Sequence, residues 1–323
     1  MKIMKKASIC HLLAMLLCVP GLWMQAQTKE IKFGKISKKD FAQCQPADST
    51  AAAVFLGKTA YTYFQLDIDG ALHVESEFKF RLQILKPEGA GYADVSIPYY
   101  QDERPGYTKE QVTNISACAY NLVDGKVEKT SLERKYIFDE PLSGHIYQIK
   151  FSIPGVKPGS IIEYKYRHTS NNPFHINNWR VQEDIPVHFA RYQLDIPEVF
   201  QFHITSKGAL PLERQKTKTN SFMSSRGYDG HSRSIQNDSY TFTCTNVPPL
   251  EDEPLIWSKE NYRGSVDFEI KGIDIIMGPH EQFRNTWEDV CLELKDYGGF
   301  SPYANMRNPL HEAQQQLGLD SSM

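Results

Sequence analysis

The chain has 323 residues, of which 41% are hydrophobic and 12% are aromatic, and its formal net charge at pH 7 is −3. This length can bury a substantial core, as one large or two medium domains. The slightly acidic balance excludes the basic footprint of a nucleic-acid-binding protein, so no nucleic-acid partner is expected. The 17 Tyr and 17 Phe residues favour a β-rich globular protein over a disordered or coiled-coil one.

The N-terminal residues have the pattern of a secretory signal peptide. Lysines among the first six residues precede an apolar run over 9–19, and Ala26 follows as a small residue for cleavage. We therefore expect residues 1–26 to be a signal peptide and the mature protein to be exported. The apolar run is too short to span a membrane comfortably, and no later stretch reads as a transmembrane segment. Cys18 leaves a lipid anchor open, although Leu17 before it is not the small residue that lipidation signals use.

Alternation of apolar and polar residues predicts a series of short antiparallel strands from residue 61 onward. The first two strands are joined by Asp69-Gly70, and a later pair by Asp124-Gly125; both dipeptides favour tight hairpin turns. The stretch 49–56 is ambiguous between a helix and an edge strand. Strands are expected over 61–68, 72–85, 93–99, 112–122, 126–132, 179–183, 188–196, 200–204 and 240–245.

The most informative stretch covers residues 151–167. Residues 147–153 alternate as a strand with one buried face does, and residues 160–168 alternate again. Between them Pro158 pre-sets φ and Gly159 accepts a positive φ, which predicts a type II turn. The pattern predicts two amphipathic strands around a turn fixed by proline and glycine.

The character of the sequence changes in its last third. Residues 207–238 are rich in Ser, Lys, Arg and Gly, so we expect a long exposed loop there. The acidic run 251–253 before Pro254 indicates a boundary. One more strand is expected over 266–270. Thr286 then caps a helix with apolar residues at helical spacing, and a second short helix begins near Asn308.

These elements predict an all-β fold, a two-layer antiparallel β-sandwich of many short strands with a short helical C-terminal extension. The expected domains are the signal peptide (1–26), the β-sandwich (27–260) and a linker strand with helices (261–323).

Several blocks of the sequence together resemble a known family: residues 81–89 (RLQILKPEG), 97–99 (IPY), 151–166 (FSIPGVKPGSIIEYKY), 179–186 (WRVQEDIP) and 192–197 (YQLDIP). They are similar to the β-rich domain of unknown function that precedes a transglutaminase-like core in exported proteins of Gram-negative bacteria. The resemblance covers roughly residues 61–249. It implies a location in the periplasm or the outer cell envelope.

The resemblance also implies a partner, a papain-like core with which this domain makes an intramolecular contact. In such a core a Cys thiolate attacks an amide carbonyl, a His transfers the proton and an Asp orients the imidazole. The family's nucleophile would lie beyond residue 323, so residues 261–323 are expected to be the start of an absent or truncated core. No catalytic residue can be transferred to this chain, and we expect the chain itself not to be an enzyme. A longer parent protein would be transglutaminase-like or a cysteine protease.

Six cysteines minus Cys10 and Cys18 of the signal leave four in the mature chain. Their wide spacing predicts no stapled scaffold and no zinc site, and their disulfide state stays open. Two lie in predicted strands and one on the apolar side of the predicted helix, so buried, non-catalytic positions are expected for these. We assign no catalytic, cofactor-binding or metal-ligating residue, and no cofactor. The four cysteines are Cys44, Cys118, Cys244 and Cys291.

Two functions remain from the sequence. The first is a non-catalytic accessory domain that positions the core or recruits a polypeptide substrate. The second is a stand-alone envelope β-sandwich that binds a glycan or a protein. The aromatic residues considered for a sugar-binding platform, with core packing as the alternative, are Tyr99, Tyr100, Trp179, Trp257 and Tyr262.

Overall fold

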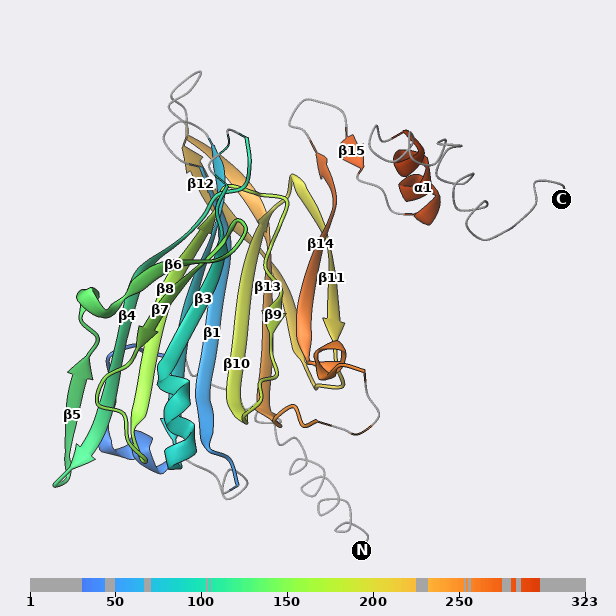
Figure 1. Ribbon diagram of the computed structural model, residues 1–323. Coiled ribbons are helices and arrows are strands. Elements are labelled where there is room, and N and C mark those ends of the chain that lie inside the picture. Colours follow the sequence, from blue (N-terminus) through green and yellow to red (C-terminus); the bar gives the residue numbers. More distant parts are fainter. Residues whose placement is uncertain are drawn as a thin grey trace, which may run out of the picture. The chain divides into compact units, whose positions relative to one another are not determined.

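The fold was analysed in a computed structural model of the chain (Figure 1). It describes residues 31–43, 50–66, 71–102, 104, 106–224, 232–252, 254, 257–274, 280–282 and 286–296. The expected signal peptide, Cys44, the turn at 67–70 and the helix near Asn308 lie outside these residues. Among the described helices, none is both long enough and apolar enough to cross a membrane.

An eight-stranded sheet forms the larger layer, in the order β12-β13-β10-β1-β2-β8-β4-β5. Neighbouring strands are antiparallel except β1 and β10, which run parallel. Its strands are β1 (Ala53–Leu66), β2 (Leu72–Ile84), β4 (Glu110–Val123), β5 (Lys126–Ser131), β8 (Ile161–Ser170), β10 (Val187–Pro197), β12 (Glu213–Ser224) and β13 (Ser232–Val247).

Two smaller sheets cover one face of the large sheet, which we call the inner face (Figure 1). Residues of all three sheets, such as Leu82, Phe151 and Val266, belong to one hydrophobic cluster. The all-β, sandwich-like fold is therefore confirmed. One small sheet has the order β3-β7-β6, with β3 (Asp94–Tyr100), β6 (Phe138–Ser143) and β7 (Ile146–Ser152); the other holds β9 (Trp179–Arg180), β11 (Phe200–Lys207), β14 (Ser265–Asp274) and β15 (His280–Gln282).

Short helices complete the described fold. Helix α1 (Trp287–Asp296) begins as expected at Thr286, whose Oγ1 accepts a hydrogen bond from the Asp289 amide at 3.1 Å. Four 3-10 helices lie between strands or before the first strand: η1 (Lys38–Ala42), η3 (Pro87–Ala93), η4 (Arg134–Tyr136) and η5 (Lys259–Tyr262).

The opposite, outer face of the large sheet is partly covered by residues 31–43. Phe33, Ile36 and Phe41 of this segment pack on a second cluster that includes Leu56 and Tyr120. The same segment covers a buried ion pair between Arg81 and Glu163 on β2 and β8. The N-terminal segment therefore closes part of a face that the alternation pattern left polar.

The stretch 151–167 folds as a strand, a turn and a strand. Gly159 has φ +89°, and the Ser160 amide donates to the Lys157 carbonyl at 2.9 Å, which fits the predicted type II turn. The two strands do not pair with each other: β7 belongs to the small sheet and β8 lies between β2 and β4 of the large sheet. The turn therefore carries the chain from one layer of the sandwich to the other.

The expectation of a long loop over 207–238 is wrong. Strands β12 and β13 form a hairpin there and pair from Glu213 with Thr243 to Ser224 with Ser232. Strand β12 is an edge strand, so its many polar side chains are solvated and the apolar half of the alternation is missing. Lys216 and Lys218 both bind Asp238 across the hairpin at 2.8 and 2.6 Å.

One other element differs from the sequence expectation. The ambiguous stretch 49–56 enters β1, which is an inner strand of the large sheet rather than an edge or a helix. The strand expected over 266–270 is present as β14, which pairs with β11 and places Val266 and Phe268 in the main core.

Candidate functional site

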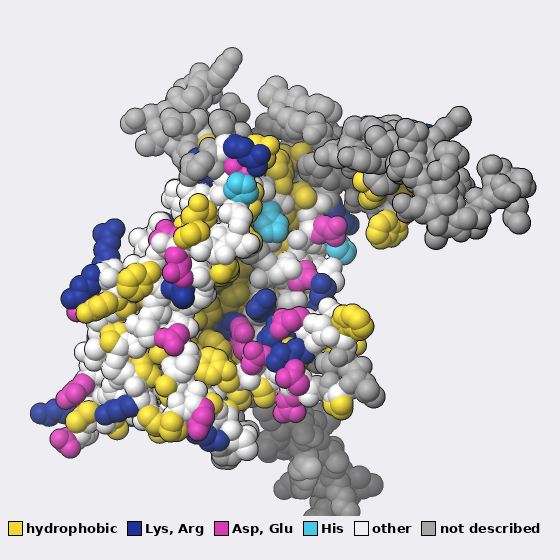
Figure 2. Space-filling view, in the orientation of Figure 1, with side chains coloured by type: hydrophobic (Ala, Val, Ile, Leu, Met, Phe, Trp, Pro, Cys, Tyr) yellow, Lys and Arg dark blue, Asp and Glu magenta, His cyan; other side chains and the backbone are white. Residues whose placement is uncertain are grey.

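A hollow opens on the inner face, and Figure 2 shows its hydrophobic floor beside a group of Lys, Arg, Asp and Glu side chains. On this face Phe78, Tyr164 and Tyr166 of the large sheet are partly exposed and pack against the main core, and we call these three rings the floor. On one side the ring of Tyr164 meets Phe151 of β7, with centroids 6.3 Å apart. On the other side Phe78 meets Trp179 of β9, also at 6.3 Å. The floor therefore lies between the two small sheets.

Cross-strand pairing fixes the rings of the floor. Phe80 is opposite Tyr164 and Phe78 is opposite Tyr166 on β2 and β8. Their ring centroids are 4.6 and 4.8 Å apart, and both pairs are stacked. Directly opposed aromatic residues stabilise a sheet and restrict one another's rotamers. The floor is accordingly a preorganised aromatic surface.

A buried lysine lies beside this floor. Lys58 is 2% exposed and forms an ion pair with Glu183. A β-bulge between Phe55 and Gly57 precedes Lys58, which points to the inner face together with Ala60 and Phe64. Its ammonium lies over the rings of Trp179 (4.8 Å), Phe55 (5.5 Å) and Phe80 (5.9 Å). Burial lowers the pKa of Lys58, and Glu183 opposes this shift.

Only one carboxylate oxygen of Glu183 contacts Lys58. Its Oε1 accepts from Lys58, whereas Oε2 has Arg263 Nη1 at 3.9 Å, beyond hydrogen-bond distance. Three tyrosine hydroxyls lie in the field of this carboxylate, and none has a hydrogen-bond partner among the described residues. They belong to Tyr92, Tyr164 and Tyr166.

The pKa values of these three tyrosines are all raised. Burial raises the pKa of all three tyrosines, and the negative charge of Glu183 raises them further. The side chains are nevertheless partly open to solvent. The hydroxyls therefore stay protonated at physiological pH and can donate or accept hydrogen bonds with a ligand.

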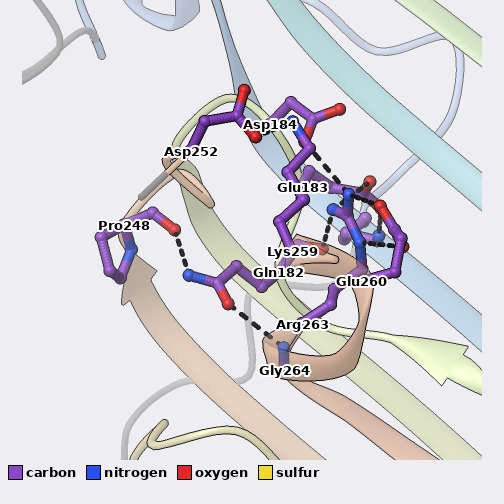
Figure 3. A network of polar contacts seen from close by, with 10 residues as sticks. Gln182, Glu183, Asp184, Pro248, Asp252, Lys259, Glu260, Arg263 and Gly264 are labelled. Atoms are coloured by element: carbon purple, nitrogen blue, oxygen red, sulfur yellow. Dashed lines mark hydrogen bonds and ion pairs between the residues drawn. The ribbon is translucent and has the colours of Figure 1, made fainter. Parts of the chain in front are cut away.

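Residues 182–184, which we call the rim, are held by a polar network (Figure 3). Arg263 is 5% exposed and donates to Glu260 (2.6 Å), Asp184 (3.1 Å) and the Gln182 carbonyl (3.0 Å). The hydrogen bond to Glu260 is the main reason that the pKa of Arg263 is raised. Lys259 adds an ion pair with Asp184 at 3.4 Å. These bonds fix the segment that carries Glu183 and Asp184 to η5 and the start of β14.

The side chain of Gln182 connects the rim to two further segments (Figure 3). Its Nε2 donates to the Pro248 carbonyl at 3.2 Å, and its Oε1 accepts from the Gly264 amide at 3.1 Å. One side chain thus bridges the chain leaving β13 and the chain entering β14. Hydrogen bonds within the chain therefore hold the rim on both sides.

Two of the described cysteines lie in settings that keep their thiols protonated. Cys118 and Cys244 are buried, as expected, and burial raises the pKa of both thiols. The expectation for Cys291 is wrong, because this residue is exposed on α1. The helical spacing placed it with apolar neighbours, but Trp287 and Leu294 of that helix are exposed as well.

Other candidate groups have ordinary surroundings. Among the described residues, no group of three or more His, Cys, Asp and Glu side chains is arranged to hold a metal ion. The aromatic residues considered for a sugar platform differ in burial. Tyr99 and Trp179 are core residues, whereas Trp257 is 100% and Tyr262 60% exposed.

The residues of the hollow were not identified from the sequence. Lys58 gives one signal, because it shares strand parity with Ala60 and Phe64 and so places a charge on an apolar face. Glu183 and Tyr92 give none, since they come from a loop and a 3-10 helix that meet only in the folded chain.

These features define a class: a sandwich-like β domain whose inner face carries an open hollow with an aromatic floor and a charged rim. The chain belongs to the DUF3857 family, a domain of unknown function with a solved structure, whose model matches residues 72–251. Among solved structures, a candidate protease from Parabacteroides distasonis ATCC 8503 is similar, with 16% identity and a TM-score of 0.49. The match covers 68% of this chain and 41% of that chain, so this chain spans less than half of its length. No curated protein matches.

Proposed function

We propose that this chain is a non-catalytic accessory domain of an exported transglutaminase-like protein, and that it recruits a polypeptide through the hollow. The observation that carries the proposal is a group of tyrosine hydroxyls, and one oxygen of Glu183, that make no hydrogen bond with the described residues and lie beside a preorganised aromatic floor. A concave, mostly apolar site with a few convergent polar groups is the usual form of a binding site. An extended polypeptide supplies carbonyl groups for the hydroxyls and side chains for the floor.

The state of the buried thiols supports a non-catalytic role. Nucleophilic cysteines work as thiolates and lie in settings that lower their pKa. Cys118 instead donates to the Tyr120 hydroxyl at 3.2 Å, and Cys244 donates to the Pro211 carbonyl at 3.6 Å. Amidase or protease activity that persists after replacement of Cys44, Cys118, Cys244 and Cys291 would overturn this part of the proposal.

The place of the domain beside a transglutaminase-like core rests on the sequence resemblance, and export rests on the pattern of residues 1–26. In that arrangement the core performs the Cys-His-Asp chemistry and this domain holds the substrate or positions the core. Reading the gene beyond codon 323 tests the arrangement. A Cys, a His and an Asp in papain-like order support it, and a stop codon at that point contradicts it.

Binding is tested with a permanently unfolded polypeptide, fluorescently labelled lactalbumin that has been reduced and carbamidomethylated. We expect its anisotropy to rise as the protein is added, and the double variant Tyr164→Phe/Tyr166→Phe to bind about tenfold more weakly, because two hydrogen bonds are lost. Tyr136→Phe is the control, since Tyr136 is 49% exposed on η4 outside the hollow. No binding by the wild-type protein, or equal binding by the double variant, contradicts the proposal.

One observation favours a second candidate function, glycan binding. Trp257 and Tyr262 expose their rings beside the polar rim, at 100% and 60% exposure. Exposed aromatic rings can stack on sugar rings. A glycan array separates the two functions: retention that is lost in Trp257→Ala supports glycan binding, and absence of any retained glycan removes this candidate.

A further inference from the structure

We propose that the hollow accepts a basic side chain, a lysine or an arginine, of the polypeptide that it recruits. This inference rests on the proposed function and adds the chemical class of the bound residue. It follows from which polar groups around the hollow are already paired and which are still free.

The free groups are hydrogen-bond acceptors with negative charge. Glu183 Oε2 makes no hydrogen bond with the described residues, its nearest cationic atom being Arg263 Nη1 at 3.9 Å, and the side chain is 24% exposed. Asp184 uses Oδ1 for both Arg263 and Lys259, which leaves Oδ2 without a partner among the described residues. The hydroxyl oxygens of Tyr164 and Tyr166 add further acceptors. An ammonium or guanidinium group supplies the several N–H donors that such a set requires.

The aromatic surroundings also suit a cation. The faces of Trp, Tyr and Phe attract an ammonium or guanidinium group that approaches within about 6 Å of the ring centroid. The same region already uses this chemistry, because the Lys58 ammonium lies 4.8 Å from the centroid of Trp179 while bound to Glu183. A second cation on the open side of Glu183 would find the oxygen of the same carboxylate that has Arg263 at 3.9 Å but no hydrogen bond among the described residues.

Three basic groups near the hollow are already paired and offer little to an anion, whereas Arg180, whose charge also acts on Lys58, is exposed to solvent. Lys58 is bound to Glu183, and Lys259 contacts Asp184 and Asp252, each at 3.4 Å. Arg263 is committed to Glu260, Asp184 and a backbone carbonyl. A neutral apolar side chain would remove Glu183 Oε2 from water without replacing its hydrogen bond, which is unfavourable.

The test uses nine-residue peptides that differ only in one side-chain type. The probes are acetylated and amidated peptides of repeating Gly-Leu-X, in which X is lysine, arginine, norleucine or glutamate. Calorimetric titration of the wild-type protein is expected to give affinities for the lysine and arginine peptides about tenfold higher than for norleucine, and no binding of glutamate. Raising the salt concentration should reduce the advantage of lysine over norleucine.

Two variants locate the effect. Glu183→Gln keeps an acceptor for Lys58 and removes the charge, and Asp184→Asn does the same at a side chain that is 55% exposed. Both are expected to reduce the preference for lysine over norleucine, whereas Tyr136→Phe leaves it unchanged. Asp184→Asn gives a usable answer even if Glu183→Gln unfolds.

The outcomes separate the two levels of the proposal. If lactalbumin binds in the hollow but the norleucine peptide binds as tightly as the lysine peptide, the inference is wrong and the proposed function stands. If lactalbumin and all four peptides fail to bind, both are wrong. A lysine preference that both acidic variants leave unchanged places the cation elsewhere and also overturns the inference.

Discussion

Two buried ion pairs on opposite faces of the same sheet show how different such pairs can be. On the outer face, Glu163 is 0% exposed and accepts from Arg81 Nε at 2.8 Å, Arg81 Nη2 at 2.6 Å and the Gly34 amide at 2.8 Å. Arg81 also donates to the Lys32 carbonyl at 3.2 Å. Both oxygens of this carboxylate are used, and residues 31–43 cover the pair.

The pair on the inner face is not saturated. Lys58 is 2% and Arg81 9% exposed, but Glu183 is partly exposed and one of its oxygens makes no hydrogen bond with the described residues. A fully satisfied buried pair fixes a structure, whereas a partly satisfied one beside a hollow can bind a further group. The comparison therefore supports a structural role for Arg81 and Glu163, and it supports the binding role proposed for the surroundings of Glu183.

The largest expected effect is that of Arg81→Met. It leaves Glu163 buried without a counter-charge, which we expect to lower the free energy of unfolding by about 3–5 kcal/mol. Urea denaturation of variant and wild type measures the difference. A loss below about 1 kcal/mol would mean that Glu163 is not the saturated structural carboxylate described here.

A smaller loss is expected for Gly159→Ala, in the turn that precedes β8. This strand carries Glu163 on the outer face and Tyr164 on the inner face, so the turn sets the position of both. An added Cβ meets no atom within 4 Å, but φ is +89°, so only backbone strain of about 1–2 kcal/mol is introduced. Gly91→Ala is the matched control, since it also has open space and has no positive φ. If both variants melt alike, the turn does not require a glycine.

Lys58→Met should cost less than Arg81→Met, and this difference is the sharpest check of the comparison. The methionine keeps the apolar contacts with the rings, and Glu183 can turn to water because its side chain is 24% exposed. We expect a loss of about 1 kcal/mol. Equal losses in the two methionine variants, measured by urea denaturation, would remove the distinction between a saturated and an open pair.

The smallest effect concerns pH and a third acidic group, Glu110. Burial alone would raise the pKa of Glu110, but hydrogen bonds from His168 and the Tyr100 amide lower it below the ordinary value of 4.5. A lowered carboxyl pKa stabilises the fold above about pH 4.5, and the contribution is lost as pH falls through the folded-state pKa. Glu110→Gln should therefore be less stable than wild type at pH 6, with a difference that shrinks on acidification to pH 3. A difference independent of pH would contradict this assignment.

Local rules of the sequence were sufficient for many elements. Asp124 and Gly125 have φ values of +47° and +70°, as a tight hairpin requires, and Gly159 adopts the positive φ of the predicted turn. These features depend on a few neighbouring residues. The sandwich-like class followed from them, because alternating strands with frequent turns must bury their apolar faces against another layer.

Features that depend on distant pairing could not be predicted. Alternation does not say which strands pair, so neither the parallel contact of β1 with β10 nor the separation of β7 from β8 was visible. The edge strand β12 lacks an apolar face and resembled a loop. The hollow combines Lys58, Tyr92, Tyr164 and Glu183 from four separate segments, so only Lys58, with its parity on an apolar strand face, gave a local signal.

Hydrogen–deuterium exchange with and without the unfolded lactalbumin tests most directly whether the open pair, rather than the saturated one, marks the binding face. Binding in the hollow predicts slower exchange of amides in η3 (87–93) and in residues 181–184, which carry Tyr92, Glu183 and Asp184. Amides of residues 31–36, over Arg81 and Glu163, should exchange at an unchanged rate. Protection of residues 31–36 with none at 181–184 would contradict the account.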